Sequence, residues 1–298
     1  MSAQVLSGRA ARVRAAGAGA VAGGGSGLGR AFARTPYYVL TGGLAIIFLY
    51  PLIWTGVSSV SPQPGSAQTD GFGFGNYGTV ADYQAGIWTY LGNSLVVSLV
   101  AVVVTLVVST LGGYAFARFR FWGKDALFLL TLAILMVPYA TLLIPLVIWL
   151  KSLHLNNTLL GVGLVLAVFQ LPFATFMMRI SFEAVPREIE EAALVDGCGS
   201  FAALRRILLH AVKPGLITVG LFAFLAAWND FMVPLYLVGG DKQPLPLAMV
   251  NLRQQTMGVI DYGATQAGVV ILTVPCVLLF LLLQRHYVNG FMSGALKG

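Results

Sequence analysis

Long stretches without a charged side chain constrain this chain more than any other feature of its sequence. Between Asp125 and Lys151 lie 25 uncharged residues, and between Lys151 and Arg179 lie another 27. A helix needs about 20 mostly apolar residues to cross the roughly 30 Å hydrocarbon core of a bilayer. Of the 298 residues, 57% are hydrophobic and 10% are charged, whereas soluble domains carry about 25% charged residues. The sequence therefore predicts an all-α integral membrane protein.

Six apolar segments can be delimited by the charges that flank them. They are Tyr37–Val60, a segment centred on Leu95–Leu111, 126–150, 152–178, Pro214–Val238 and 262–284. Prolines interrupt several of these segments, and a proline inside a helix removes a backbone hydrogen bond and kinks the helix. These prolines are Pro138, Pro145, Pro172 and Pro275. The sequence predicts six transmembrane helices, with no specific role for the kinks.

The basic residues indicate the orientation, because Lys and Arg concentrate in cytoplasmic loops. Residues 1–34 hold five arginines and no acid, and we expect a flexible basic cytoplasmic tail there. The segments 118–125, 179–213 and the residues after 284 hold ten Lys and Arg, against three in the opposite loops. Both termini are therefore predicted to be cytoplasmic, with residues 35–298 as one six-span domain. The net charge of +7 then reflects membrane topology and lipid contact rather than nucleic-acid binding.

The layout excludes several classes of protein. The segments outside the spans hold about 35 residues or fewer, whereas a folded domain usually needs about 50. The chain thus has no room for a soluble catalytic or ATP-binding domain, and we expect it not to be an enzyme. His154, His210 and His286 lie in different predicted loops, so neither a metal site nor a catalytic triad is predicted. We expect no cofactor on this chain.

The segment Pro186–Gly215 carries signals for two short helices. Pro186 suits a first helical position, and Gly197 suits the end of that helix. Ser200 is predicted to cap a second helix, which ends near His210. Helices of about ten residues are unstable alone in water, so something must pack against them. Periodicity alone is equally compatible with an amphipathic connector lying on the membrane surface.

The spacing within this segment favours a more specific interpretation. It reads Glu191-Ala192-Ala193, three residues, Gly197, nine residues, then Ile207-x-Leu209. This pattern resembles the EAA loop of ABC importer permeases, with His210 in place of the usual proline. The resemblance implies that loop 179–213 couples the chain to a cytoplasmic ATPase. The residues to which it assigns this coupling are Glu191, Ala192, Ala193, Asp196, Gly197, Ile207 and Leu209.

The resemblance covers most of the chain from Tyr37 onward and narrows to the shorter, MalG-like partner of the maltose-type carbohydrate importer permeases. Similar segments include YLGNSLVVS, YAFARFRF, MVPYATLLIPL, VPREIEEAALVDG, WNDFMVPL and the terminal GFMSGALKG. It implies a type I ABC importer permease fold in the cytoplasmic membrane of a bacterium. The implied partners are a second permease subunit in a heterodimer, two ABC ATPase subunits that bind ATP and Mg²⁺, and an external sugar-binding protein.

Two further groups of residues are candidates for function. Trp228, Asn229 and Asp230 combine an aromatic face with polar groups, the chemistry that sugars favour, so they are candidate substrate-path residues. An acid at membrane depth usually faces a cavity or a partner, but Asp230 equally suits a place near the outer boundary, accepting hydrogen bonds from backbone amides. Gly294 and Lys297 belong to a small, flexible terminus. Alone it resembles a frayed end, whereas the family resemblance implies contact with the ATPase dimer interface.

Three alternatives remain at this point. An ion-coupled secondary transporter would use Asp230 as its coupling acid but would not need the EAA spacing. A membrane-embedded enzyme would need clustered acids, histidines or a nucleophile at membrane depth, and the sequence offers one such acid. Within the importer family, the solute could instead be glycerol phosphate, an amino sugar or another compound.

Overall fold

The computed structural model describes residues 27–66, 68–255 and 260–295, and this part of the chain is helical without a β-strand. The predicted all-α class is confirmed. The chain divides into two compact units, residues 1–54 and residues 55–298. In chain order the elements are α2 (Gly27–Val60), α3 (Gly75–Ala81), α4 (Ile87–Arg118), α5 (Lys124–Ala133), η1 (Ile134–Met136), α6 (Tyr139–Ser152), α7 (Leu159–Glu183), α8 (Arg187–Val195), α9 (Ser200–Ala203), η2 (Leu204–Leu208), α10 (Leu209–Ala211), α11 (Lys213–Asn229), α12 (Met232–Leu237), η3 (Gly240–Lys242), α13 (Leu245–Gln255) and α14 (Tyr262–Ala295).

The described part of the first unit is α2 up to Trp54. Residues 1–26 of the predicted flexible tail lie outside the described residues, whereas residues 27–34 already form the first turns of α2. Leu28 and Ala31 are good helix formers, so the helix extends beyond the apolar run that predicts it. The helix has the length and composition of a membrane span from Pro36 to Val60.

Four of the six predicted spans correspond to continuous helices, the third corresponds to the bent pair of α5–η1 and α6, and the fifth corresponds to α11 followed by α12. Besides α2, the helices α4, α7 and α14 are long and apolar enough to cross a membrane. The predicted third span is bent by 104° between η1 and α6, next to Pro138, one of the prolines for which a kink is expected. Val137 precedes Pro138 and has an extended ψ of 127°, because the proline ring disfavours helical geometry in the residue before it.

The predicted fifth span is also interrupted. Its main helix, α11, ends at Asn229, and Asp230 has an extended ψ of 130° before α12 begins. At its other end α11 meets the helical segment Ser200–Ala211 at an angle of 79°. Pro214 lies in the first turn of α11, where its missing N–H costs no hydrogen bond. The chain therefore bends between loop 179–213 and α11 although His210 takes the place of the motif's usual proline.

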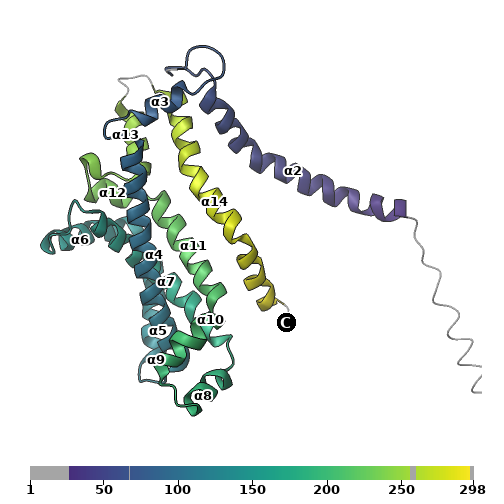
Figure 1. The fold of residues 1–298 in the computed structure, drawn as a ribbon, viewed down its shortest axis with the longest axis vertical. Coiled ribbons are helices and arrows are strands. Elements are labelled where there is room, and N and C mark those ends of the chain that lie inside the picture. Colours follow the sequence, from purple (N-terminus) through teal and green to yellow (C-terminus); the bar gives the residue numbers. More distant parts are fainter. Residues whose placement is uncertain (1–26, 67, 256–259, 296–298) are drawn as a thin grey trace, which may run out of the picture. The chain divides into compact units, whose positions relative to one another are not determined.

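Helices α4 and α7 run in the same direction and pack closely, as Figure 1 shows. A Cβ atom on Gly163 of α7 would lie 2.6 Å from Cγ1 of Val100, and one on Gly113 of α4 would lie 2.5 Å from Cβ of Met178. Only glycine permits this approach. Because the two helices are parallel, residues 119–158 must return the chain to the end where α7 begins. The bent pair α5–α6 therefore counts as one crossing.

Three clusters of buried side chains hold the second unit together. One lies at mid-length among α4, α6, α7, α11 and α12, and another joins α3, α4, α13 and α14. The third joins the ends of α4 and α7 to the helical segment that follows α8. Its fully buried members include Met178, Phe182 and Leu208. This cluster fixes loop 179–213 to the spans.

The first turns of α4 hold the segment between α12 and α13. The Asn93 side chain donates hydrogen bonds to the backbone oxygens of Asp241 and Gln243, at 2.7 and 2.9 Å. The backbone N–H of Leu245 donates to the Ser94 hydroxyl at 2.8 Å. Residues about 150 positions apart in the sequence are joined in this way at the end of the unit opposite α8.

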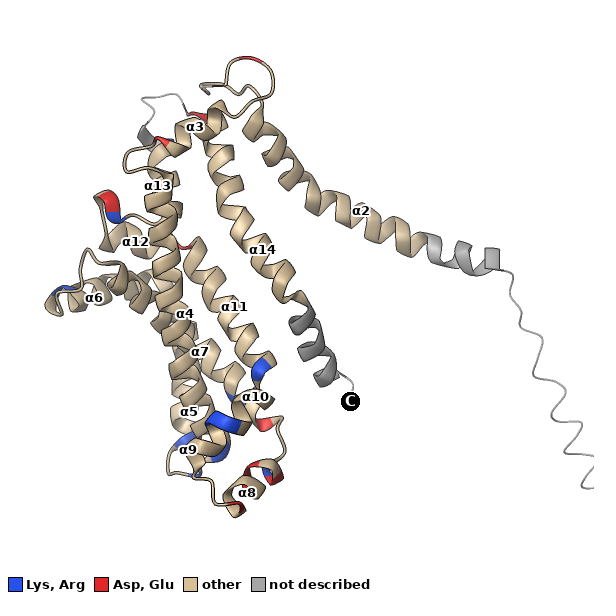
Figure 2. Cartoon of the chain, in the orientation of Figure 1, with Lys and Arg blue, Asp and Glu red and all other residues tan. Residues whose placement is uncertain are grey.

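Charged residues are concentrated at the end of the second unit that carries α8, α9 and α10, with fewer near α3, α6 and α12, while the long helices are almost free of them (Figure 2). This distribution is typical of a membrane protein whose apolar middle lies in lipid.

Candidate functional site

The beginning of α8 is set by its sequence. Pro186 has a φ of −54° and a ψ of 139°, so it precedes the helix, which begins at Arg187, one residue later than predicted. Glu188 and Glu190 lie in the first turn, where the helix dipole favours negative charge.

The end of α8 is a Schellman motif centred on Gly197. This glycine has a φ of +87°, a conformation that costs an L-residue about 1–2 kcal/mol. Its N–H donates to the Leu194 oxygen at 3.1 Å, and the Cys198 N–H donates to the Ala193 oxygen at 3.0 Å. The predicted role of Gly197 in ending the helix therefore agrees with the geometry.

Glu190 fastens α8 to the end of α4, a role that the sequence analysis missed. The Tyr114 hydroxyl donates to Glu190 Oε1 at 2.5 Å, and Arg118 Nε lies 3.2 Å from Glu190 Oε2. The Arg118 guanidinium also donates to the Val185 oxygen at 2.8 Å. The Arg118 and Glu190 side chains are 6% and 12% exposed. No local spacing signals this pairing, because the partners lie more than 70 residues apart.

The predicted coupling residues of α8 divide between two faces. Ala193 is 4% exposed and shares the inward face with Glu190. Glu188, Glu191, Ala192 and Val195 are exposed, and their i, i+3, i+4, i+7 spacing places them on one outward face. We call these four residues the outward face of α8. Ala193, one of the predicted coupling residues, thus faces the protein's own interior, whereas Ala192 beside it is exposed.

Apolar side chains enlarge this exposed surface. Val195 is 87% exposed, and Phe201, in the helix that follows, is 70% exposed. Asp196 and Gly197 between them are exposed as well. Exposed apolar groups on a loop mark a surface for interaction when they gather in one place.

The second predicted helix forms, but it begins differently from the expectation. Gly199 occupies the position before the helix, and Ser200 is its first residue without a side-chain capping bond. The helix passes through the π-helical segment η2 before it ends at Ala211. Leu204 and Leu208 are buried, whereas the motif residues Ile207 and Leu209 are half-buried.

A cavity of about 230 Å³ lies where the two interrupted spans meet α7. The Tyr139 hydroxyl, at the start of α6, donates to Asp230 Oδ2 at 2.6 Å. Asp230 Oδ1 accepts a hydrogen bond from the Val233 backbone N–H at 2.8 Å. Of the three candidate substrate-path residues, Asp230 lines this cavity. It both accepts a backbone amide and lines a cavity, and its depth in the membrane stays a prediction.

The other two candidate substrate-path residues point elsewhere. The Trp228 indole is 3% exposed and donates to the Leu272 oxygen of α14 at 3.0 Å. One face of its ring stacks on Phe224, and the low exposure of the whole side chain leaves it inaccessible to a sugar in this structure. Asn229 is exposed, and its amide donates to the Leu225 oxygen at 2.7 Å.

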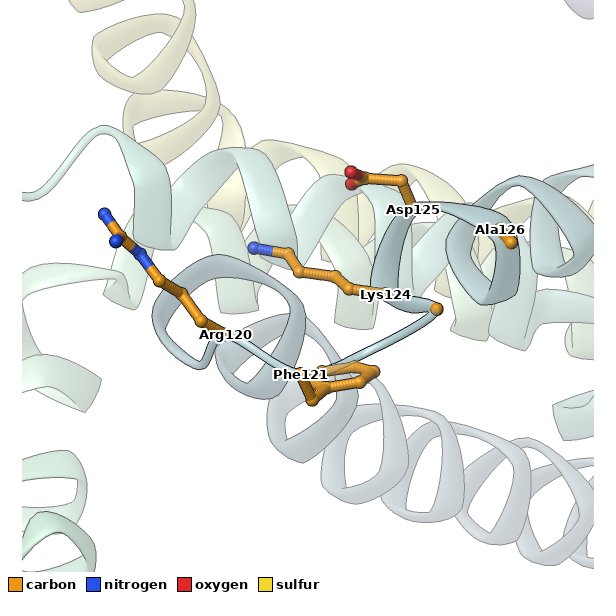
Figure 3. Close-up of a pocket in the computed structure, with 6 residues that line it drawn as sticks. Arg120, Phe121, Lys124, Asp125 and Ala126 are labelled. Atoms are coloured by element: carbon orange, nitrogen blue, oxygen red, sulfur yellow. The ribbon is translucent and has the colours of Figure 1, made fainter.

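Another cavity, of about 410 Å³, lies at the turn between α4 and α5. The side chains of Arg120 and Lys124 project to the same side of this turn (Figure 3). The exposed Phe121 and Trp122 lie in the same turn, and basic and aromatic residues together are common where a membrane protein meets the membrane–water interface.

The remaining expectations concern the terminus and metals. Gly294 lies in the last turn of α14, and Lys297 lies outside the described residues. Among the described residues, no group of three or more His, Cys, Asp or Glu side chains is placed to hold a metal ion.

Comparisons with known proteins agree on one family. The family described as "Binding-protein-dependent transport system inner membrane component" matches residues 106–291. The chain is 36% identical over 223 residues to the diacetylchitobiose uptake system permease protein DasC of Streptomyces coelicolor, covering 74% of this chain and 78% of the relative. It is 30% identical over 260 residues to the trehalose/maltose transport system permease protein MalG of Thermococcus litoralis, covering 86% and 94%.

The fold also resembles a solved structure. A chain in the crystal structure of a bacterial ABC transporter involved in the import of the acidic polysaccharide alginate superposes with a TM-score of 0.73. The match covers 88% of this chain and 98% of that chain, at 23% sequence identity. At this identity the likeness supports the fold and not the substrate.

Proposed function

The chain belongs to the family of binding-protein-dependent transport system inner membrane components, and on this premise we propose that it forms part of the translocation path of an ATP-driven carbohydrate importer. The family expected from the EAA loop is thereby confirmed. The chain is a permease component and not itself an enzyme. Relatives named as permeases for diacetylchitobiose and for trehalose/maltose support a carbohydrate as the solute.

The outward face of α8 carries the proposed coupling to the ATPase. The helix is closed by Gly197 and held by Glu190, so it presents Glu191, Ala192 and Val195 on a fixed support. A short, fixed helix transmits displacement better than a mobile loop does. We propose that Glu191 pairs with a basic residue of the ATPase while the small side chain of Ala192 permits close approach.

The proposal includes the partners of the chain and its orientation in the membrane. The chain works with a second permease subunit, two ATPase subunits that bind ATP and Mg²⁺, and an external sugar-binding protein. The α8 end of the second unit, where the charged side chains gather (Figure 2), faces the cytoplasm, as do both termini. The terminus around Gly294 and Lys297 reaches the ATPase dimer.

Reconstitution of the full complex in proteoliposomes tests this function. Uptake of labelled maltose, trehalose and diacetylchitobiose is measured with ATP on the ATPase side and the binding protein on the other side. We expect uptake of at least one of these sugars. This uptake should require both ATP and the binding protein, and it should persist when an uncoupler is added. Collapse of uptake with the uncoupler while ATP remains would instead support an ion-coupled transporter that uses Asp230. Absence of uptake of all three sugars would contradict the proposal that the solute is a carbohydrate.

A further inference from the structure

Gln170 is a polar residue at the middle of a membrane span. It is the twelfth residue of α7, which has 25, so it lies about 17 Å from the beginning of the helix at 1.5 Å per residue. Its neighbours along α7 are almost all apolar. The side chain is half-buried and lines the 230 Å³ cavity. A primary amide at this depth is costly without hydrogen-bond partners.

The Gln170 amide has no hydrogen-bond partner among the residues that the structure describes. The amide offers two donors and an acceptor. The nearby Tyr139–Asp230 pair has its own hydrogen bonds but keeps spare acceptor capacity on the Asp230 carboxylate and on the Tyr139 oxygen. One wall of the cavity thus offers acceptors, while Gln170 supplies the donors.

The rest of the cavity is apolar and aromatic. The Phe169 and Tyr139 rings lie edge to face, with their centroids 4.6 Å apart, and both rings line the cavity. Leu142 and Leu166 are among the other apolar residues of the lining. Aromatic faces suit the C–H surfaces of a sugar, whereas the amide and carboxylate suit its hydroxyls.

We propose that this cavity is a binding site on this chain for one carbohydrate ring, in which Gln170 donates to one sugar hydroxyl and Asp230 accepts from another. The inference rests on the proposed carbohydrate import. A volume of about 230 Å³ is below the roughly 300–1,000 Å³ of pockets for drug-sized ligands, so the site takes a single ring of a longer sugar. Tyr139 positions the Asp230 carboxylate through its hydrogen bond.

A double-mutant cycle between protein and sugar tests the site. The complete complex is reconstituted, and turnover is measured with saturating binding protein for the best-transported of maltose, trehalose and diacetylchitobiose. The same measurement is made for each monodeoxy analogue of that sugar. We expect the wild type to transport one analogue roughly tenfold more slowly than the parent sugar, as for the loss of one hydrogen bond in a site built to make it. Gln170→Leu should erase that difference.

The controls separate a binding role from a structural one. Gln284→Leu also removes an amide from a spanning helix, but Gln284 does not line the cavity, so it should leave the discrimination unchanged. If Gln170→Leu fails to assemble, Gln170→Asn shortens the side chain while keeping the amide and is carried through the same cycle.

Two outcomes would overturn the inference. One is that every deoxy analogue is discriminated equally by the wild type and the Gln170 variant, although the parent sugar is transported. The other is that the variant slows all the sugars by the same factor, as a packing defect would. Absence of wild-type transport for all three parent sugars would overturn the carbohydrate class in the proposed function itself.

Discussion

The Glu190 carboxylate on α8 forms an ion pair with Arg118 at the end of α4, with 3.2 Å between Oε2 and Nε. Both side chains are almost fully buried, and removing one partner of a buried pair costs about 3–5 kcal/mol, because the other charge is left uncompensated. We expect Glu190→Gln to loosen α8 while the spans still insert. Sugar transported per ATP hydrolysed should fall, and proteolysis within loop 179–213 should accelerate.

The matched control for this prediction is Glu183→Gln. Glu183 pairs with Arg179 one turn away at 2.8 Å, but its side chain is 46% exposed, and such pairs contribute about 0.5 kcal/mol or less. Equal proteolysis rates in the two variants would argue against a fastening role for Glu190.

Gly197→Val should uncouple transport from ATP hydrolysis. The φ of +87° is strained for a β-branched residue, and the Schellman motif would open. Membrane insertion should be normal, whereas sugar uptake should fall at least tenfold. Gly199→Ala is the control, because Gly199 has a φ of −73° and open space around its Cα atom. Normal uptake by Gly197→Val would contradict the proposed role of this helix end.

Gly113→Ala should destabilise the packing of α4 against α7. The added Cβ would lie 2.5 Å from Cβ of Met178 and 2.8 Å from the Arg179 nitrogen, so the helices must separate. Overpacking of this kind costs about 1–3 kcal/mol. Thermal unfolding of the purified chain in detergent measures the effect. Gly92→Ala, also on α4 but with nothing within 4 Å of the added atom, should unfold like the wild type.

Val195→Asp should weaken ATPase binding without affecting the fold. Val195 is 87% exposed on the outward face of α8, so the substitution buries no charge in the free chain. Burying the new carboxylate in an interface carries a desolvation cost, and we expect at least a tenfold loss of affinity. Co-purification of the ATPase with the tagged chain measures it. Retention of the ATPase at the wild-type level would place the docking surface elsewhere.

Much of the fold follows from local sequence. The uncharged runs predict the positions of the spans, because crossing a bilayer requires an apolar stretch of a certain length regardless of its neighbours. Gly197 and the first-turn acids of α8 likewise predict a short helix from local sequence alone. The positive φ of Gly197 agrees with that prediction.

Other features depend on contacts between distant residues. Pro138 predicts a kink in the third span, but an uncharged run does not show how far a helix turns, so the size of the bend, 104°, was not predicted. The pairing of Glu190 with Tyr114 and Arg118 joins separate helices, and no spacing encodes it. Gln170 was counted as part of an apolar span, because it carries no charge. The proposed binding role of Gln170 follows only from the fold, which places it at the cavity together with the Tyr139–Asp230 pair.

Helix α4 connects the two ends of the second unit. Through Arg118 it is attached to α8, and through Asn93 and Ser94 it is attached to the segment before α13. Its 32 residues form one unbroken rod of about 48 Å. Under the proposed coupling, a pull on α8 would be carried by this one helix to the opposite end of the second unit, past the two bent spans beside it.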